Sequence, residues 1–463
     1  MFIFPLIFIC SFVMAVREIL RGNSSGLLLF MIFGLSIYTT TMSVTFMLGL
    51  KSIIPTMQFF KEALIFGVLL LNLANLKYRP RFHLIDYTIM AFLLYLILYA
   101  LLPIGEQGLF DRLIALKSTA FYIMVYFVGR TIDAKEIYIN KYFNYLVLLT
   151  IAAGAVLVVE LLMYQQLQLR TGYAEYNYYF FNAEPSGQYG ISTTFDSDSG
   201  YRRFASFFTN PLELAAASII SLAVIAGLYT TDNNKLRINS VGMLGLGASF
   251  LAILFALSRA PLASYFVVIY VYALLTKRKA ITHIIHLGFC VVAIYVAYLF
   301  WQFEQNHEGI IQILINTIDF SDPSSIGHLQ QWVEGVLAII NNPMGLGLGS
   351  SGRVAGTLGE NVGGENQYII IGVQAGIIAL LLYLCIYVMV IRTGIKWLPK
   401  LKGKERQVCL TVLLIKIGFI IPSLTSEFEG SAYISYINWF LTGLLINMIM
   451  KPVITQTKPA DDH

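Results

Sequence analysis

Arginines outside the basic loops are the side chains of this chain best suited to chemistry on a phosphate. Arg259 lies in a tight Ser258-Arg259-Ala260 turn between two apolar runs, and Arg202 and Arg203 lie shortly before another apolar run. A planar, permanently charged guanidinium suits bidentate binding of phosphate. An arginine at a membrane boundary can instead serve only as a snorkelling anchor, and the Arg202-Arg203 pair can be an ordinary basic loop end. The sequence leaves these alternatives open.

One carboxylate is placed where it could accept a proton from a reacting hydroxyl. Glu365 follows Gly363 and Gly364 and precedes an apolar run that begins at Tyr368. Glycines let the backbone approach a ligand closely, and a positioned carboxylate can act as a general base. The competing interpretation is a helix cap, a role that Asn366 would share.

The elements that hold these residues are expected to be membrane helices. Hydrophobic residues make up 57% of the 463 residues, charged residues 12%, and the mean hydropathy is +0.71. About thirteen continuous apolar runs approach the roughly 20 residues that span a bilayer as a helix. They lie near 2–16, 27–50, 53–76, 84–103, 113–130, 142–164, 211–229, 239–257, 260–276, 281–303, 367–391, 408–424 and 433–450. The sequence therefore predicts an all-α polytopic integral membrane protein, with 1–463 as a single membrane domain.

Most of the 31 Lys and Arg residues fall in alternate loops between these runs. The positive-inside rule places such loops in the cytoplasm, which puts the N-terminus outside and the C-terminus in the cytoplasm. The first run lacks a basic n-region and a small-residue cleavage site, so we expect a retained helix. The net charge of +5 then reflects topology and contact with anionic membrane lipid, and we expect no nucleic-acid partner.

Two long loops on the expected outer side are the predicted location of the chemistry. They cover 165–210 and 304–366, and the second contains an amphipathic stretch at 326–340 with Trp332. Aromatic residues between Gly172 and Tyr189 can stack on sugars or anchor the loop at the membrane surface. The loops show no metal-ligand spacing, and the four cysteines lie within apolar runs. We therefore expect neither a metal nor a cofactor.

Several ionisable residues lie inside the apolar runs, where charge is costly and usually faces the interior of the bundle. They are Lys61, Glu62, Asp86, Lys117, Glu160 and Lys416. We expect structural pairs between helices, with separate partners for the adjacent Lys61 and Glu62, because neighbours on a helix point about 100° apart. Glu213 suits the start of its helix. Glu427 and Glu429 either line the opening of a cavity or belong to a solvated loop.

Four elements occur in a fixed order along the chain. They are Arg202-Arg203 before Asn210-Pro211, the turn Ser258-Arg259-Ala260, the glycine run from Asn342-Pro343 to Gly349, and Glu365-Asn366-Gln367-Tyr368 before an apolar run. In this order, over roughly Arg202 to Leu382, the chain resembles the bacterial O-antigen polymerase and O-antigen ligase superfamily.

The resemblance implies a helical membrane glycosyltransferase of GT-C-like architecture in the bacterial inner membrane. Its substrate would be an undecaprenyl-pyrophosphate-linked oligosaccharide, bound at the outer face, and a chain-length co-polymerase would be a further partner. The resemblance implies that Arg202 or Arg203 and Arg259 hold the pyrophosphate, and Arg353 after the glycine run is a further candidate. We therefore expect catalytic roles for Arg259 and, from its own position, Glu365, with substrate binding by Arg202, Arg203, Arg353 and Tyr368.

The residue at 365 separates the branches of the superfamily. The ligase branch typically has a histidine at this place, so Glu365 favours a polymerase of lipid-linked repeat units. The alternatives are a ligase that transfers glycan to lipid A core and, from another class, a flippase of lipid-linked oligosaccharides. A flippase should show cation-lined cavities within the membrane and internal repeats, and no similarity between the halves of the chain is evident.

Overall fold

The computed structural model describes residues 1–75, 81–135, 137–197, 200–303, 323–358 and 361–450. Within these ranges the regular structure is helical, apart from two isolated β-bridges. Ten helical segments are long and apolar enough to cross a membrane, and three shorter apolar helices lie at Ser240–Phe255, Arg259–Leu275 and Lys279–Tyr295. These segments coincide with the predicted apolar runs. The prediction of an all-α polytopic membrane protein is therefore confirmed.

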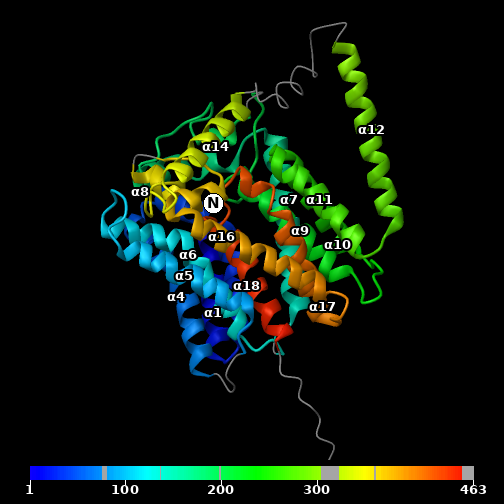
Figure 1. Ribbon diagram of the computed structural model, residues 1–463, viewed down its shortest axis with the longest axis horizontal. Helices are drawn as coiled ribbons and strands as arrows, with labels where there is room; N and C mark the ends of the chain where they lie inside the picture. The colour runs from blue at the N-terminus through cyan, green and yellow to red at the C-terminus, as the bar shows by residue number, and fades with distance from the viewer. Residues whose placement is uncertain (76–80, 136, 198–199, 304–322, 359–360, 451–463) are drawn as a thin grey trace, which may run out of the picture.

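The helices follow one another with short connections in most places (Figure 1). The first half contains α1 (Ile3–Leu20), α2 (Leu27–Leu29), α3 (Tyr38–Met47), α4 (Ile54–Ala74), α5 (Leu84–Leu101), α6 (Leu109–Thr131), α7 (Ile139–Met163), α8 (Tyr173–Phe181) and α9 (Pro211–Tyr229). The second half contains α10 (Ser240–Phe255), α11 (Arg259–Leu275), α12 (Lys279–Phe303), α14 (Pro323–Asn341), α15 (Gly352–Leu358), α16 (Gln367–Trp397), α17 (Gly403–Gly418) and α18 (Ala432–Ile449).

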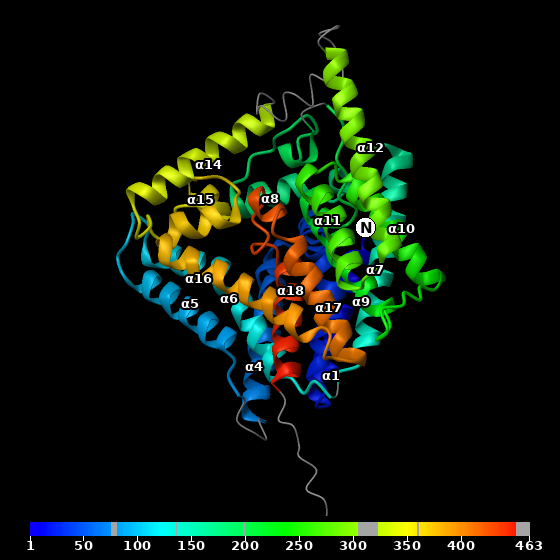
Figure 2. The same cartoon turned by 45° about the vertical axis from the view of Figure 1, so that its right-hand side comes forward.

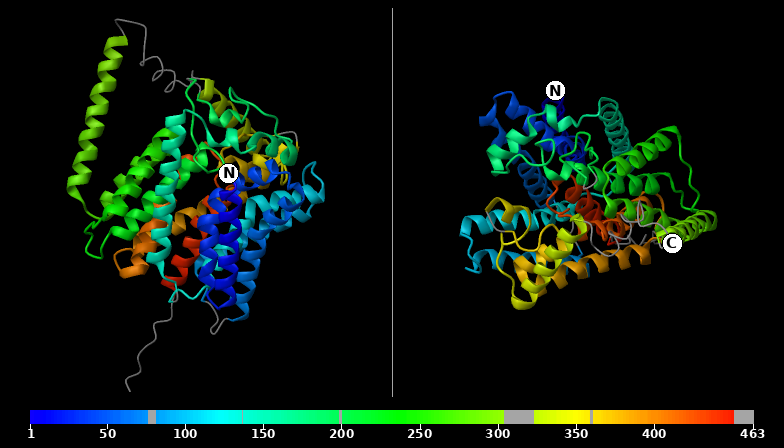
Figure 3. Two further views of the ribbon diagram at one scale, coloured as in Figure 1. Left: turned by 180° about the vertical axis from the view of Figure 1, so that it is seen from behind. Right: turned by 90° about the horizontal axis from the view of Figure 1, so that it is seen from above.

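The centre of the bundle is formed by α9, α17 and α18, whose apolar side chains are mostly buried. α18 packs along α6, where the rings of Tyr122 and Trp439 stack with their centroids 4.8 Å apart. α12 lies at the edge of the bundle beside α11, which is clear from the front and from behind (Figures 1 and 3). α8, α14 and α15 gather at one end of the bundle (Figure 2). This end carries the loops in which the sequence locates the chemistry.

The long helix α16 is interrupted within its apolar part. Gly376 has φ 78° and ψ −178°, which no helical residue adopts. The glycine run approaches α16 at this break: the Ile377 N–H donates to the Pro343 carbonyl at 2.9 Å, and the Leu346 N–H donates to the Val373 carbonyl at 2.7 Å. Backbone groups within a bilayer must find partners inside the protein. The glycine run therefore supplies partners that the broken helix lacks.

The same run is packed too closely for side chains at its centre. Gly347 has φ 103°, and a Cβ there would lie 2.3 Å from the Ile104 carbonyl oxygen. The Gln374 side chain ties the end of the run to α16, because its amide donates to the Ser351 carbonyl at 2.7 Å and its oxygen accepts from the Gly349 N–H at 3.2 Å. The start of α15, which carries Arg353, is thereby fixed against α16.

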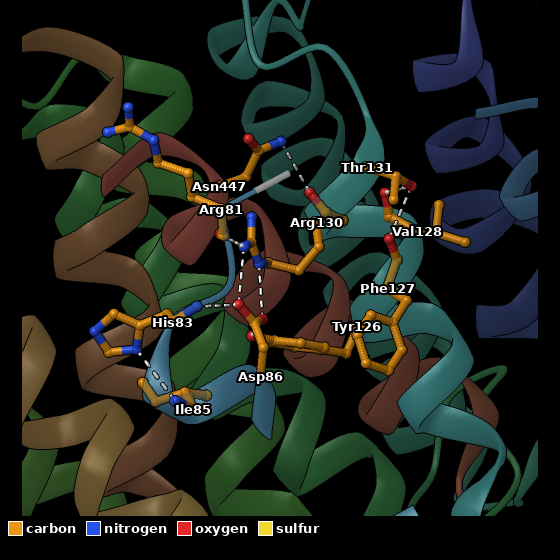
Figure 4. Close-up of polar contacts among 11 residues, drawn as sticks. Arg81, His83, Ile85, Asp86, Tyr126, Phe127, Val128, Arg130, Thr131 and Asn447 are labelled. Carbon is orange, nitrogen blue, oxygen red and sulfur yellow. Dashed lines mark hydrogen bonds and ion pairs between the residues drawn. The ribbon is translucent and has the colours of Figure 1, made fainter. Parts of the chain in front are cut away.

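A second polar contact joins the first turn of α5 to the last turn of α6 (Figure 4). The fully buried Asp86 carboxylate accepts two hydrogen bonds from the Arg130 guanidinium, both at 2.8 Å. The Tyr126 hydroxyl and the His83 backbone N–H complete its shell at 2.5 and 2.6 Å. The expected structural pairing of Asp86 is therefore present, with every oxygen of a buried charge hydrogen-bonded.

Candidate functional site

A cavity of about 650 Å³ opens at the end of the bundle that carries α8 and α15. Its walls come from α3, α4, α6, α8, the start of α9, α15, and the loops that precede α16 and α18. Its charged lining residues are Lys61, Lys117, Glu213, Arg353, Glu365 and Glu427. Acidic and basic side chains thus face the same cavity, together with aromatic and apolar side chains, as in many ligand-binding sites.

Glu365 contributes its carboxylate to this wall and does not cap α16. The cap is Asn366, whose side-chain oxygen accepts from the backbone N–H groups of Tyr368 at 3.0 Å and Ile369 at 3.2 Å. The Glu365 side chain is exposed in the cavity. The capping function therefore belongs to Asn366, and the carboxylate of Glu365 stays available to a ligand.

Arg353 and Glu427 lie beside Glu365 in the same wall. The Arg353 backbone N–H donates to Glu427 Oε2 at 2.7 Å, and the Arg353 side chain is exposed to the cavity. Burial raises the pKa of the Glu427 carboxyl, the Arg353 charge lowers it, and the Glu365 charge raises it. From the sequence, Glu427 could either line a cavity or belong to a solvated loop. The fold brings it next to Arg353 and Glu365, which the sequence analysis had predicted as site residues.

Arg202 lies outside the cavity, in a separate contact. Its guanidinium stacks between the rings of Tyr164 and Tyr189, at 4.5 and 4.3 Å from their centroids. It also donates to the Tyr164 carbonyl. This cation–π sandwich holds the beginning of the long loop against the segment that leads into α9.

Arg203 joins the segment before α9 to the turn that contains Arg259. Its Nε donates to the Ala256 carbonyl at 2.9 Å, and the following Phe204 N–H donates to the Phe255 carbonyl at 3.2 Å. The first two motifs of the ordered set are therefore neighbours in space. Arg259 begins α11 with an exposed side chain.

The predicted site residues thus divide into two groups. Arg353 and Glu365 line the cavity, whereas Arg202, Arg203 and Arg259 are outside its described lining. Tyr368 is also outside that lining, and its hydroxyl donates to the Ile420 carbonyl at 3.2 Å. A buried stretch at 204–208 leads from the arginine group to Thr209 and Asn210 in the cavity wall.

The aromatic loop residues also divide by location. Tyr173, Tyr176 and Phe181 of α8 line the cavity, whereas Tyr178 and Tyr179 are exposed. Burial raises the pKa of Tyr173 to about 12, so its phenol is neutral and can donate a hydrogen bond. Part of this loop therefore faces the cavity, and part is exposed outside it.

Lys61, Glu62 and Lys117 form one cluster in the wall made by α4 and α6. Glu62 Oε1 lies 3.2 Å from the Lys61 Nζ and 2.6 Å from the Lys117 Nζ. The expected pairing between helices is present, because Lys117 on α6 contacts Glu62 on α4, and Lys61 has its own partner in the Tyr38 hydroxyl. Lys61 and Glu62 also contact each other, which was not expected. A long and flexible lysine side chain can reach a neighbouring residue on the same helix despite the angle of about 100° between them. The side chains of Lys61 and Lys117 both line the cavity.

Part of the chain matches a known protein family. Residues 244–384 match the family model described as O-antigen ligase. This range begins in α10 and ends in α16, so it includes Arg259, the glycine run, Arg353 and Glu365. No match to a curated protein was found. Over residues 244–384 the match is consistent with the resemblance to the O-antigen polymerase and O-antigen ligase superfamily.

Proposed function

We propose that the chain is a glycosyltransferase that polymerises undecaprenyl-pyrophosphate-linked oligosaccharide repeat units. It would transfer the glycan from one lipid carrier to the sugar of another at the outer face of a bacterial inner membrane. The observation that carries the proposal is the shared cavity of Arg353, Glu365 and Glu427. Arg353 and Glu365 lie within the residues that match the family model described as O-antigen ligase. Their side chains are exposed in the wall of the cavity.

The proposed chemistry needs no nucleotide, because a pyrophosphate on a lipid is already a good leaving group. An acceptor hydroxyl attacks the anomeric carbon of the donor glycan, and the bond from that carbon to the pyrophosphate oxygen breaks. The electron pair leaves with the pyrophosphate, whose growing charge arginines stabilise. The hydroxyl proton passes to Glu365 as general base. Tyr173 and Tyr176 would contact the sugar rings.

Two observations bear on the alternatives. The match to the family described as O-antigen ligase does not separate a ligase from a polymerase, whereas Glu365 at the place of the ligase histidine favours a polymerase. The lysines in the cavity wall are a feature that a flippase would share.

Purified protein in liposomes with lipid-linked repeat should form a ladder of longer lipid-linked glycans and release carrier pyrophosphate. Product only after addition of lipid A core would indicate a ligase, and translocation without product a flippase.

Arg259 is proposed as a ligand of the pyrophosphate. Arg259→Ala should abolish long-chain product while protein level and membrane insertion remain normal. Arg259→Lys should recover little, because a single ammonium does not reproduce the planar fork of donors. Gel separation of lipid-linked product measures the effect. Arg170→Ala is the matched control, since Arg170 is an exposed loop arginine that contacts Gln165. Full chain length in Arg259→Ala would leave Arg259 as a membrane anchor.

A further inference from the structure

The cluster of Lys61, Glu62 and Lys117 contains more positive charge than a pair between helices needs. Both ammonium groups approach the same carboxylate oxygen, so the cluster keeps an excess of one positive charge. Glu62 itself is 4% exposed. A single lysine would neutralise this carboxylate, and a second cation inside a membrane span is expensive unless it has a further partner.

The two lysines differ in how fully their hydrogen-bond donors are used. Lys61 Nζ donates to the Tyr38 hydroxyl and the Gln58 carbonyl, both at 3.0 Å, and also contacts Glu62. Lys117 has Glu62 as its partner among the described residues. An ammonium carries three donors, so Lys117 retains donors that its contacts do not use.

Lys117 presents these donors to the cavity. Its side chain is 57% exposed, compared with 15% for Lys61, and both residues line the cavity. Each lies about two helical turns from the start of its helix, which is roughly 10–12 Å along the axis. The neighbouring lining residues Gln58, Thr39 and Asn210 are polar. This part of the wall is therefore a cationic, hydrogen-bonding surface within membrane-spanning segments.

We propose that Lys117, supported by Lys61, binds a phosphate group carried by a lipid. This site differs from the arginine group at Arg202, Arg203 and Arg259, which lies outside the described lining of the cavity. Lys117 and Glu365 line the same cavity, so a phosphate bound here would share the space of the proposed base. The identity of the lipid as the undecaprenyl carrier rests on the proposed function, whereas binding of a lipid phosphate does not.

The test is a binding measurement that requires no turnover. Full-length protein in dodecyl maltoside micelles, which contain no phosphate, is titrated with undecaprenyl pyrophosphate, with phosphatidylglycerol, and with inorganic pyrophosphate in separate arms. Lys117→Ala should weaken binding of the lipid phosphate by about tenfold, the usual loss for one charge-assisted contact. Lys117→Arg should stay within about threefold of the wild type because the charge remains. The arm that responds identifies the source of the phosphate.

Two further variants make the outcome specific. Glu62→Gln removes the competing carboxylate and should tighten binding about threefold or more, whereas a purely structural pair predicts lower thermal stability and no gain in affinity. Lys51→Ala is the matched control, because Lys51 packs on Phe46 and Tyr179 outside the described lining of the cavity. It should leave every arm unchanged.

The outcomes separate this site from the proposed function. Unchanged affinity for both lipids in Lys117→Ala and in Glu62→Gln, with normal thermal unfolding, would overturn the phosphate site and leave the polymerase proposal standing. Lipid phosphate binding that depends on Lys117, in a protein that forms no polymer, would support the site and overturn the polymerase. Equal loss in the inorganic pyrophosphate arm would show that the lipid is not needed and would overturn its part in the proposal.

Discussion

Replacement of Glu365 by glutamine is expected to lower turnover by at least about a hundredfold, the usual contribution of a general base. Glutamine has nearly the same shape but cannot accept the proton of the attacking hydroxyl. The fold should be preserved, because Asn366 caps α16 through its own hydrogen bonds at 3.0 and 3.2 Å. The measurement is the initial rate of lipid-linked polymer formation, with thermal unfolding and carrier binding recorded on the same preparation.

Two glutamate variants serve as comparisons for Glu365→Gln. Glu175→Gln changes an exposed glutamate of α8 outside the described lining of the cavity, and it should retain the wild-type rate. Glu427→Gln keeps an oxygen that can accept the Arg353 N–H, so it should fold and lose less activity than Glu365→Gln. Near-wild-type polymer from Glu365→Gln together with inactive Glu427→Gln would transfer the role of base to Glu427.

The membrane fold was accessible from the sequence because its signal is local. An apolar run of about 20 residues is long enough to span the bilayer as a helix, whatever the rest of the chain does. Runs such as 84–103 and 433–450 accordingly correspond to α5 and α18. The interruption of α16 could not be recognised as easily from the sequence. Gly376 lies in an apolar run that reads as continuous, and its role depends on Pro343 and Leu346 approaching from a distant segment.

The candidate site was predictable in part, and the limits follow from its long-range contacts. Arg353 and Glu365 are near one another in sequence and lie next to glycines, which marked them for attention. Glu427 reaches the cavity through a contact with Arg353, 74 residues away. Lys117 on α6 and Lys61 on α4 both contact the Glu62 carboxylate. Side chains brought together only by packing leave no spacing pattern, so charge inside an apolar run was their one visible signal.

Gly376, at the break in α16, is expected to tolerate no other residue without a loss of stability. Gly376 adopts φ 78° and ψ −178°, a region that is essentially restricted to glycine and costs other residues about 1–3 kcal/mol. A Cβ at this position would also lie 2.5 Å from the Pro343 carbonyl oxygen. Gly376→Ala should therefore lower the thermal unfolding temperature in detergent and reduce the yield of monodisperse protein.

Gly376→Ala should also impair activity, because hydrogen bonds link α16 near the break to the segment that leads into the cavity wall. The Gln374 side chain links α16 to Ser351 and Gly349, and these residues precede Arg353. Gly67→Ala provides the matched control in α4, where a Cβ would meet nothing within 4 Å. It should leave stability unchanged or raise it by up to about 1 kcal/mol, since alanine favours a helix over glycine. Equal unfolding temperatures for Gly376→Ala and Gly67→Ala would refute the strained break, because strain and the clash with Pro343 act on the folded state of Gly376→Ala alone.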